Sequence, residues 1–73
     1  MTEDEAELMA LLPEHGSIAI SVGEYGEARY ARLLSAVSEL HARGLVGVKY
    51  GEAGFRVALK DEGRRQLRGE GEA

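Results

Sequence analysis

The spacing of hydrophobic residues along the chain predicts two amphipathic helices separated by a strand. In residues 3–12 the apolar side chains recur every three or four positions, as they do on the buried face of a helix. Residues 27–43 repeat this pattern over a longer stretch and predict the main helix of the fold. Between the two, residues 17–22 (SIAISV) alternate with a period of two, which predicts a short, half-buried strand.

The second half of the chain predicts a β-hairpin and a final helix. Residues 45–50 and 55–60 each alternate with a period of two, and the glycine-flanked segment between them suits a tight connection. Asp61 is a suitable cap for a short last helix over residues 62–68. The predicted order is α-β-α-β-β-α, an α+β fold whose small antiparallel sheet includes the strand at 17–22.

Residues at the ends of the predicted helices support these boundaries. Thr2 and Glu5 have the spacing of a capping box at the start of the first helix, and Pro13 ends that helix. Gly44 suits the left-handed position that follows a helix C-terminus, so the main helix should end near Arg43.

Length and composition limit the classes of protein to consider. Seventy-three residues form one domain, which we place at residues 1–68, followed by a flexible acidic tail at 69–73. The absence of cysteine excludes thiol catalysis and zinc–thiolate sites. His15 and His41 lie far apart without a carboxylate at a recurring ligand spacing, so we expect no metal, cofactor or catalytic site. No apolar run approaches the roughly 20 residues of a membrane span, and the acidic N-terminus is unlike a signal peptide, so we expect a cytoplasmic protein.

Charge is distributed unevenly along the chain, although the net charge is −4. Residues 1–28 contain seven acidic residues and no lysine or arginine, whereas all nine basic residues lie in residues 29–68 with only four acidic ones. This second segment has a net charge of +5 and could present a basic face, because fields decay over about 8 Å at physiological salt. Alternatively, the two halves neutralise one another across the fold.

The sequence LHARGLVGVKYGEAGFRVALKDEGRRQL, residues 40–67, resembles part of the winged helix-turn-helix regulators of the MarR, PadR and ArsR kind. In those proteins the recognition helix closes with a basic-Gly-Leu-Val step, a two-stranded wing follows, and an L-T-x-x-G-R-x-x-L segment begins the last helix. Residues 59–67 match that segment, with Lys60 in place of the usual threonine. The resemblance implies a winged helix in which residues 27–43 contact the major groove of DNA and residues 45–60 form the wing.

One part of the chain departs from this family pattern. Winged helices place a short helix and a tight turn before the recognition helix, but residues 17–26 have the pattern of a strand followed by glycines. The second helix is therefore either very short, around residues 23–26, or replaced by the strand.

The resemblance also identifies residues expected to contact DNA. Arg29 and Arg32 lie one turn apart near the start of the predicted recognition helix, and arginine is the usual partner of guanine in the major groove. Small residues after them would let the helix approach the bases, and basic residues of the wing would contact phosphates. The predicted DNA-binding residues are Arg29, Arg32, Ser35, Ala36, Arg43, Lys49, Arg56 and Lys60.

Each group of basic residues also has a purely structural interpretation. Arg32 could form ion pairs with acidic residues of the first helix, and the basic residues of the hairpin could protect edge strands from aggregation. The arginines of the last helix, Arg64, Arg65 and Arg68, could extend the basic face or complement the C-terminal end of that helix.

The resulting hypothesis is a winged-helix protein that binds double-stranded DNA as a homodimer and regulates transcription. The alternative is a protein–protein interaction module that keeps the winged-helix scaffold and binds a protein partner through the wing or the acidic first helix. The net negative charge and the incomplete second helix favour the alternative, whereas the arginines and the +5 segment favour DNA. No nucleophile is paired with a base in the sequence, so neither hypothesis includes an enzyme.

Overall fold

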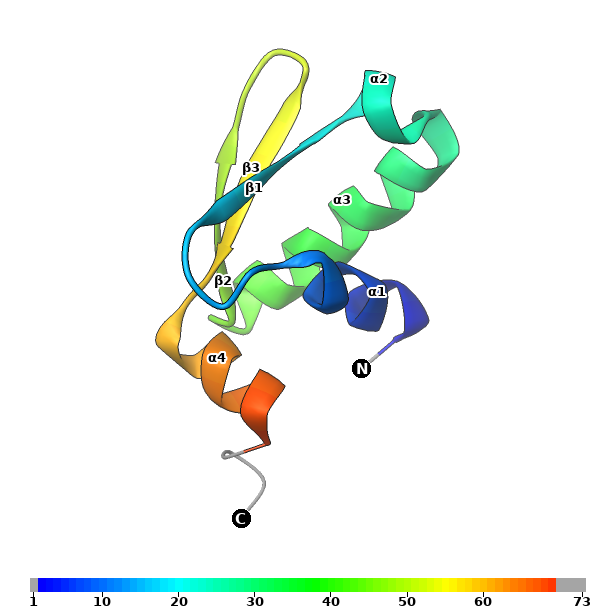
Figure 1. Ribbon diagram of the computed structural model, residues 1–73. Coiled ribbons are helices and arrows are strands. Elements are labelled where there is room, and N and C mark those ends of the chain that lie inside the picture. The colour runs from blue at the N-terminus through cyan, green and yellow to red at the C-terminus, as the bar shows by residue number, and fades with distance from the viewer. Residues whose placement is uncertain (1, 70–73) are drawn as a thin grey trace.

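The computed structural model describes residues 2–69, which form four helices and one three-stranded antiparallel sheet (Figure 1). In chain order the elements are α1 (Glu3–Leu11), β1 (Ser17–Ser21), α2 (Val22–Tyr25), α3 (Glu27–Ala42), β2 (Val46–Tyr50), β3 (Gly54–Leu59) and α4 (Asp61–Arg68). The predicted α+β fold with a small antiparallel sheet is confirmed, and the order of elements is compatible with a winged helix. Most of the predicted acidic tail, residues 70–73, lies outside the described residues.

The start and end of α1 follow from three side chains. The Thr2 hydroxyl accepts the Glu5 N–H at 3.2 Å, and the Glu5 carboxylate accepts the Thr2 N–H at 3.0 Å, which confirms the predicted capping box. At the other end the helix stops at Leu11, and Leu12 is extended because it precedes Pro13.

The sheet has β3 in the middle, with β1 and β2 at its edges. Its register aligns the larger apolar residues of the strands on one face, where Phe55 of β3 is opposite Ile20 of β1 and Tyr50 of β2. The predicted pairing of the first strand with the hairpin is therefore confirmed. We call the opposite side of the sheet the outer face; its residues are Ser17, Ala19, Ser21, Gly47, Lys49, Gly54, Arg56 and Ala58.

The core lies between the inner face of the sheet, α3 and α1. Leu33, Val37 and Leu40 of α3 are almost completely buried, as the helical spacing predicts. Gly44 has a φ of +77° and ends the helix in the left-handed geometry expected of it. The buried apolar residues are Leu8, Met9, Leu12, Ile20, Leu33, Ala36, Val37, Leu40, Leu45, Val46, Phe55, Val57 and Leu59.

The segment before α3 contains both a strand and a short helix, whereas the sequence predicted either a very short helix or a strand in its place. The strand ends at Ser21, one residue earlier than predicted, because the Ser21 hydroxyl accepts the Glu24 N–H at 3.3 Å and caps α2. α2 is only four residues long, since Gly26 has a φ of +85° and turns the chain into α3. The predicted order α-β-α-β-β-α is therefore wrong at this point, because it lacks α2.

Candidate nucleic-acid interface

Two of the three arginines predicted on the DNA-contacting face of α3 form ion pairs with α1. The Arg29 guanidinium lies 2.6 Å from the Glu7 carboxylate and 5.1 Å from the ring centre of Tyr25 in α2. Arg43, at the other end of α3, lies 3.3 Å from Glu5. These contacts hold α1 and α2 against α3, so both guanidinium groups are already engaged.

Ala36 does not belong to an exposed face, which corrects the sequence-based prediction. It is only 4% exposed because α1 packs against this side of α3, and its methyl group is part of the core. Arg32 and Ser35 are exposed, as predicted, and line an open groove between α3 and the start of α1. Because Asp4 and Glu39 line the same groove, its charge is mixed rather than basic.

The predicted basic residues of the hairpin lie together on the outer face of the sheet or directly beside it. Lys49 of β2 and Arg56 of β3 are direct cross-strand neighbours, and both are exposed. Lys60 follows β3, and its Cε would lie 3.6 Å from a Cβ placed on Gly47, so its side chain passes over the outer face. No residue of the strands on this face is acidic.

The remaining outer-face residues are small, which leaves the backbone of the sheet accessible. Ser17, Gly47 and Ala58 line an open groove together with the side chains of Lys49 and Arg56. Arg56 donates a hydrogen bond to the Ser17 hydroxyl at 3.2 Å, which holds its guanidinium across the sheet. These small residues were not predicted as part of a site, although they occupy every second position of strands whose other positions are large and apolar.

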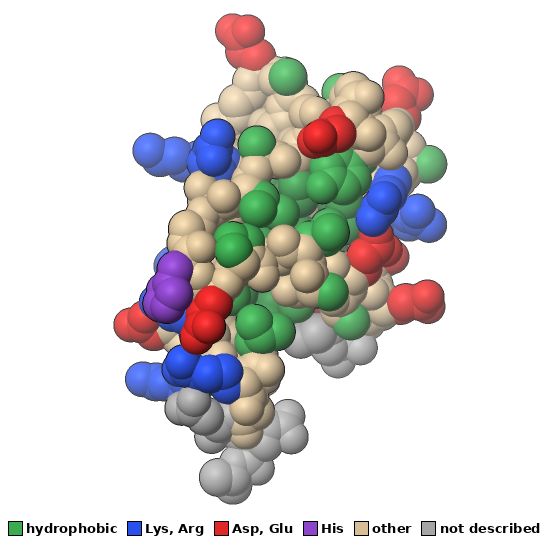
Figure 2. Space-filling model, viewed as in Figure 1, with side chains coloured by type: hydrophobic (Ala, Val, Ile, Leu, Met, Phe, Trp, Pro, Cys, Tyr) green, Lys and Arg blue, Asp and Glu red, His purple; other side chains and the backbone are tan. Residues whose placement is uncertain are grey.

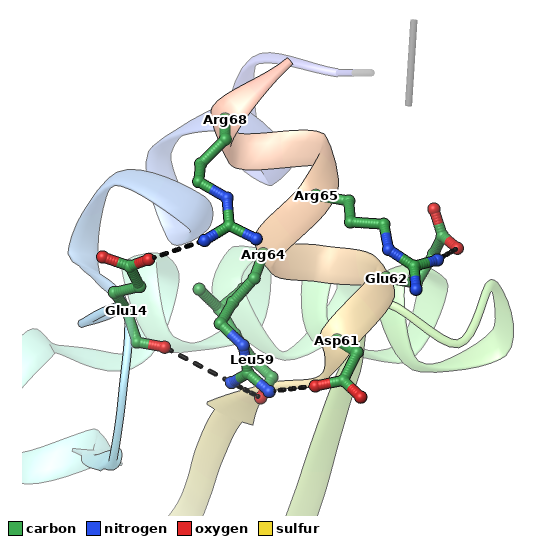
Figure 3. Close-up of polar contacts among 7 residues, drawn as sticks. All are labelled: Glu14, Leu59, Asp61, Glu62, Arg64, Arg65 and Arg68. Atoms are coloured by element: carbon green, nitrogen blue, oxygen red, sulfur yellow. Dashed lines mark hydrogen bonds and ion pairs between the residues drawn. The ribbon is translucent and has the colours of Figure 1, made fainter. Parts of the chain in front are cut away.

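The arginines of α4 form contacts within α4 and with the segments that lie beside it (Figure 3). Arg64 pairs with Asp61 and also donates hydrogen bonds to the carbonyl groups of Leu59, at 3.1 Å, and Glu14, at 3.3 Å. Within α4, Arg65 pairs with Glu62 at 3.3 Å. Arg68 pairs at 3.1 Å with the Glu14 carboxylate, which belongs to the turn after α1. All three arginines therefore have partners within the fold, and the contacts of Arg64 and Arg68 with Glu14 join α4 to the segment after α1.

The basic residues therefore divide into two classes. Among residues 2–69, five arginines form ion pairs with carboxylates, whereas four basic residues form none: Arg32, Lys49, Arg56 and Lys60. Three of those four lie on or beside the outer face. Figure 2 shows the basic side chains of one side of the molecule in separate groups near its rim.

Comparisons with protein-family models, curated proteins and solved structures found no match for this chain. Among the described residues, no three histidine or acidic side chains come together as a metal site would require. No helix within residues 2–69 has both the length and the hydrophobicity needed to cross a membrane.

Proposed function

We propose that this chain is a winged-helix domain that binds duplex DNA, as a regulator of transcription would, mainly through the outer face of its sheet. The observation that carries the proposal is the group of three basic side chains, Lys49, Arg56 and Lys60, that form no ion pair with a carboxylate within residues 2–69. The chain order of helices and strands and the sheet order β1-β3-β2 are compatible with a winged helix.

Electrostatics explains why such a face would favour DNA. A duplex carries about one negative charge per 1.7 Å of its axis, and neutralising its phosphates releases condensed counterions. Lys49 and Arg56 are directly opposite one another, so their Cβ atoms are roughly 5 Å apart and can serve neighbouring phosphate oxygens. Small neighbours such as Ala58 and Gly47 would let the phosphate backbone approach without steric hindrance.

The test is the binding of a mixed-sequence, fluorescently labelled DNA duplex, measured by anisotropy. Lys49→Ala should lower the affinity about five- to tenfold at roughly 0.1 M salt, because one phosphate contact contributes about 0.9 to the slope of log K against log salt. Arg65→Ala is the matched control, because it removes the same charge from an exposed residue that already forms an ion pair with Glu62. Equal losses for the two variants would contradict a role for the outer face.

A protein-interaction module is the second candidate, and one observation favours it. The contacts of Arg29 and Arg43 with α1 leave Arg32 as the only cation of α3 that forms no ion pair within residues 2–69. A helix with so little free positive charge is a poor reader of bases. If the intact chain does not bind duplex DNA even at low salt, this second function replaces the first.

A further inference from the structure

The strand β1 leaves one whole edge of the sheet open. It pairs with β3 on one side, and within residues 2–69 no other strand lies beside it. No turn, loop or cap in this part of the chain forms a backbone hydrogen bond with residues 17–21. The outward N–H and C=O groups of β1 are therefore available to another strand.

The residues of β1 themselves include none of the charged side chains or prolines that protect sheet edges, and the charged group that reaches this strand is the Arg56 guanidinium at Ser17. The sequence of β1 is Ser-Ile-Ala-Ile-Ser, with no charged residue and no proline. The opposite edge, β2, carries Lys49, and Lys60 passes beside Gly47. Since charged side chains are the usual protection of an edge strand, the contrast marks β1 as the edge adapted for pairing.

The order of residues in β1 identifies the partner. Ser17–Ser21 has the same sequence in both directions about Ala19, so antiparallel pairing with a second copy places like residues together. We propose that the chain forms a homodimer in which β1 pairs with β1 of a second copy across a twofold axis at Ala19. In this register Ser17 is opposite Ser21 of the second copy, and Ile18 is opposite Ile20.

Burial supports the pairing of β1 with a second copy. Ile20 is buried in its own core, whereas Ile18 is only half-buried, so the second copy would cover apolar surface that the single chain exposes. Figure 2 shows hydrophobic side chains in the middle of one side of the molecule, with most charged ones towards its rim. An isologous pair of this kind is closed, which limits the assembly to two chains.

The dimer would contain one continuous six-stranded sheet with both outer faces on the same side. Three strand spacings would separate the two copies of Arg56, about 14 Å, and five would separate the two copies of Lys49, about 24 Å. The pairing itself does not depend on DNA binding, so it can be tested without DNA.

Single cysteines provide the test, because the natural chain has none. Residues directly opposite in an antiparallel pair have Cα atoms about 4.5–5.5 Å apart, within the range of disulfides. Ala19→Cys should therefore form a disulfide-linked dimer rapidly under mild oxidation. Ala31→Cys, which lies on the exposed side of α3, is the control and should remain largely monomeric on a non-reducing gel.

Two further variants test the register. Ser17→Cys alone and Ser21→Cys alone should not cross-link, because like residues lie about 14 Å apart along the strands. A mixture of the two variants should cross-link, since residue 17 faces residue 21 of the second copy. Cross-linking of each variant by itself would contradict the proposed register.

Sedimentation equilibrium of the intact chain provides an independent measurement. The expected mass is twice the 7.9 kDa of one chain, and Ala19→Lys should halve it by placing two lysines together at the axis. Circular dichroism would establish that this variant remains folded, as expected for an exposed position. A single-chain mass for the natural protein, or efficient cross-linking of Ala31→Cys, would overturn the proposal.

Discussion

At the scale of single residues, two glycines permit backbone approaches that no other residue would allow. A Cβ at Gly54 would lie 2.0 Å from the Ile20 carbonyl oxygen, where β3 meets β1. A Cβ at Gly63 would lie 2.1 Å from the Leu45 carbonyl oxygen, where the first turn of α4 packs against the chain before β2. The close approach to Leu45 gives a physical reason for a glycine at position 63.

Gly63→Ala should therefore destabilise the protein. The new methyl group would force α4 away from Leu45, and overpacking of this kind costs about 1–3 kcal/mol. The better helix propensity of alanine offsets at most about 1 kcal/mol of that cost. A lower midpoint of urea unfolding would report the change.

Gly23→Ala is the matched control for that experiment. Gly23 is also helical, but a Cβ there would meet no atom within 4 Å. We therefore expect unchanged or slightly higher stability, by up to about 1 kcal/mol. If both alanines had the same effect, the backbone contact at Gly63 would not be the cause.

The burial of Ala36 could not be predicted from its position in the sequence. Helical spacing correctly predicts that Leu33, Val37 and Leu40 are buried, because they recur on one face of α3. Ala36 borders that face, and its burial depends on whether α1 covers it. The spacing of hydrophobic residues predicts which side of its own helix a side chain occupies, but it does not predict where the neighbouring helix lies.

At the scale of elements, the pattern of the sequence predicts every helix and strand except α2. The helix over 27–43 and the hairpin strands differ from α3, β2 and β3 by at most one residue at either end, because long periodic segments carry a strong signal. α2 has only four residues, which is too short to show a helical period, and two of them, Gly23 and Glu24, are not hydrophobic. Its existence depends on the Ser21 cap and on its packing against α3.

The contacts between α1 and α3 lead to a prediction about Arg29. Because Arg29 is paired with Glu7 and lies over Tyr25, Arg29→Ala should reduce stability by about 1 kcal/mol. The variant should change the affinity for duplex DNA less than twofold, in contrast to Lys49→Ala. Urea unfolding and anisotropy on the same preparations would measure the two effects.

The opposite result is equally informative. If Arg29→Ala abolished DNA binding while stability changed little, α1 would have to release the arginine when DNA binds. In that case α3 would be the DNA-contacting element, as the family resemblance implies. Glu7→Gln should then increase the affinity, because it weakens the contact that holds Arg29.

At the scale of the whole molecule, the distribution of charge matters more than its sum. The chain has a net charge of −4, and its extents are 39 × 22 × 18 Å. At about 0.1 M salt the Debye length is about 10 Å, so a phosphate at the outer face is influenced mainly by Lys49, Arg56 and Lys60. At about 0.01 M salt it is about 30 Å, and the acidic residues of the whole chain contribute.

This difference predicts an unusual salt dependence for DNA binding. Above about 0.05 M salt, log K should fall linearly against log salt with a slope near −3, as about three phosphate contacts require. Below about 0.01 M the line should flatten, because the net negative charge then repels the duplex. Replacing Glu27 and Glu39 together by glutamine would change the net charge of the whole chain from −4 to −2. Both residues lie in α3, across the core from the outer face. The double variant should therefore restore the linear rise of log K at low salt. A line without flattening in the natural chain would mean that its acidic residues lie too far from the bound duplex to influence it.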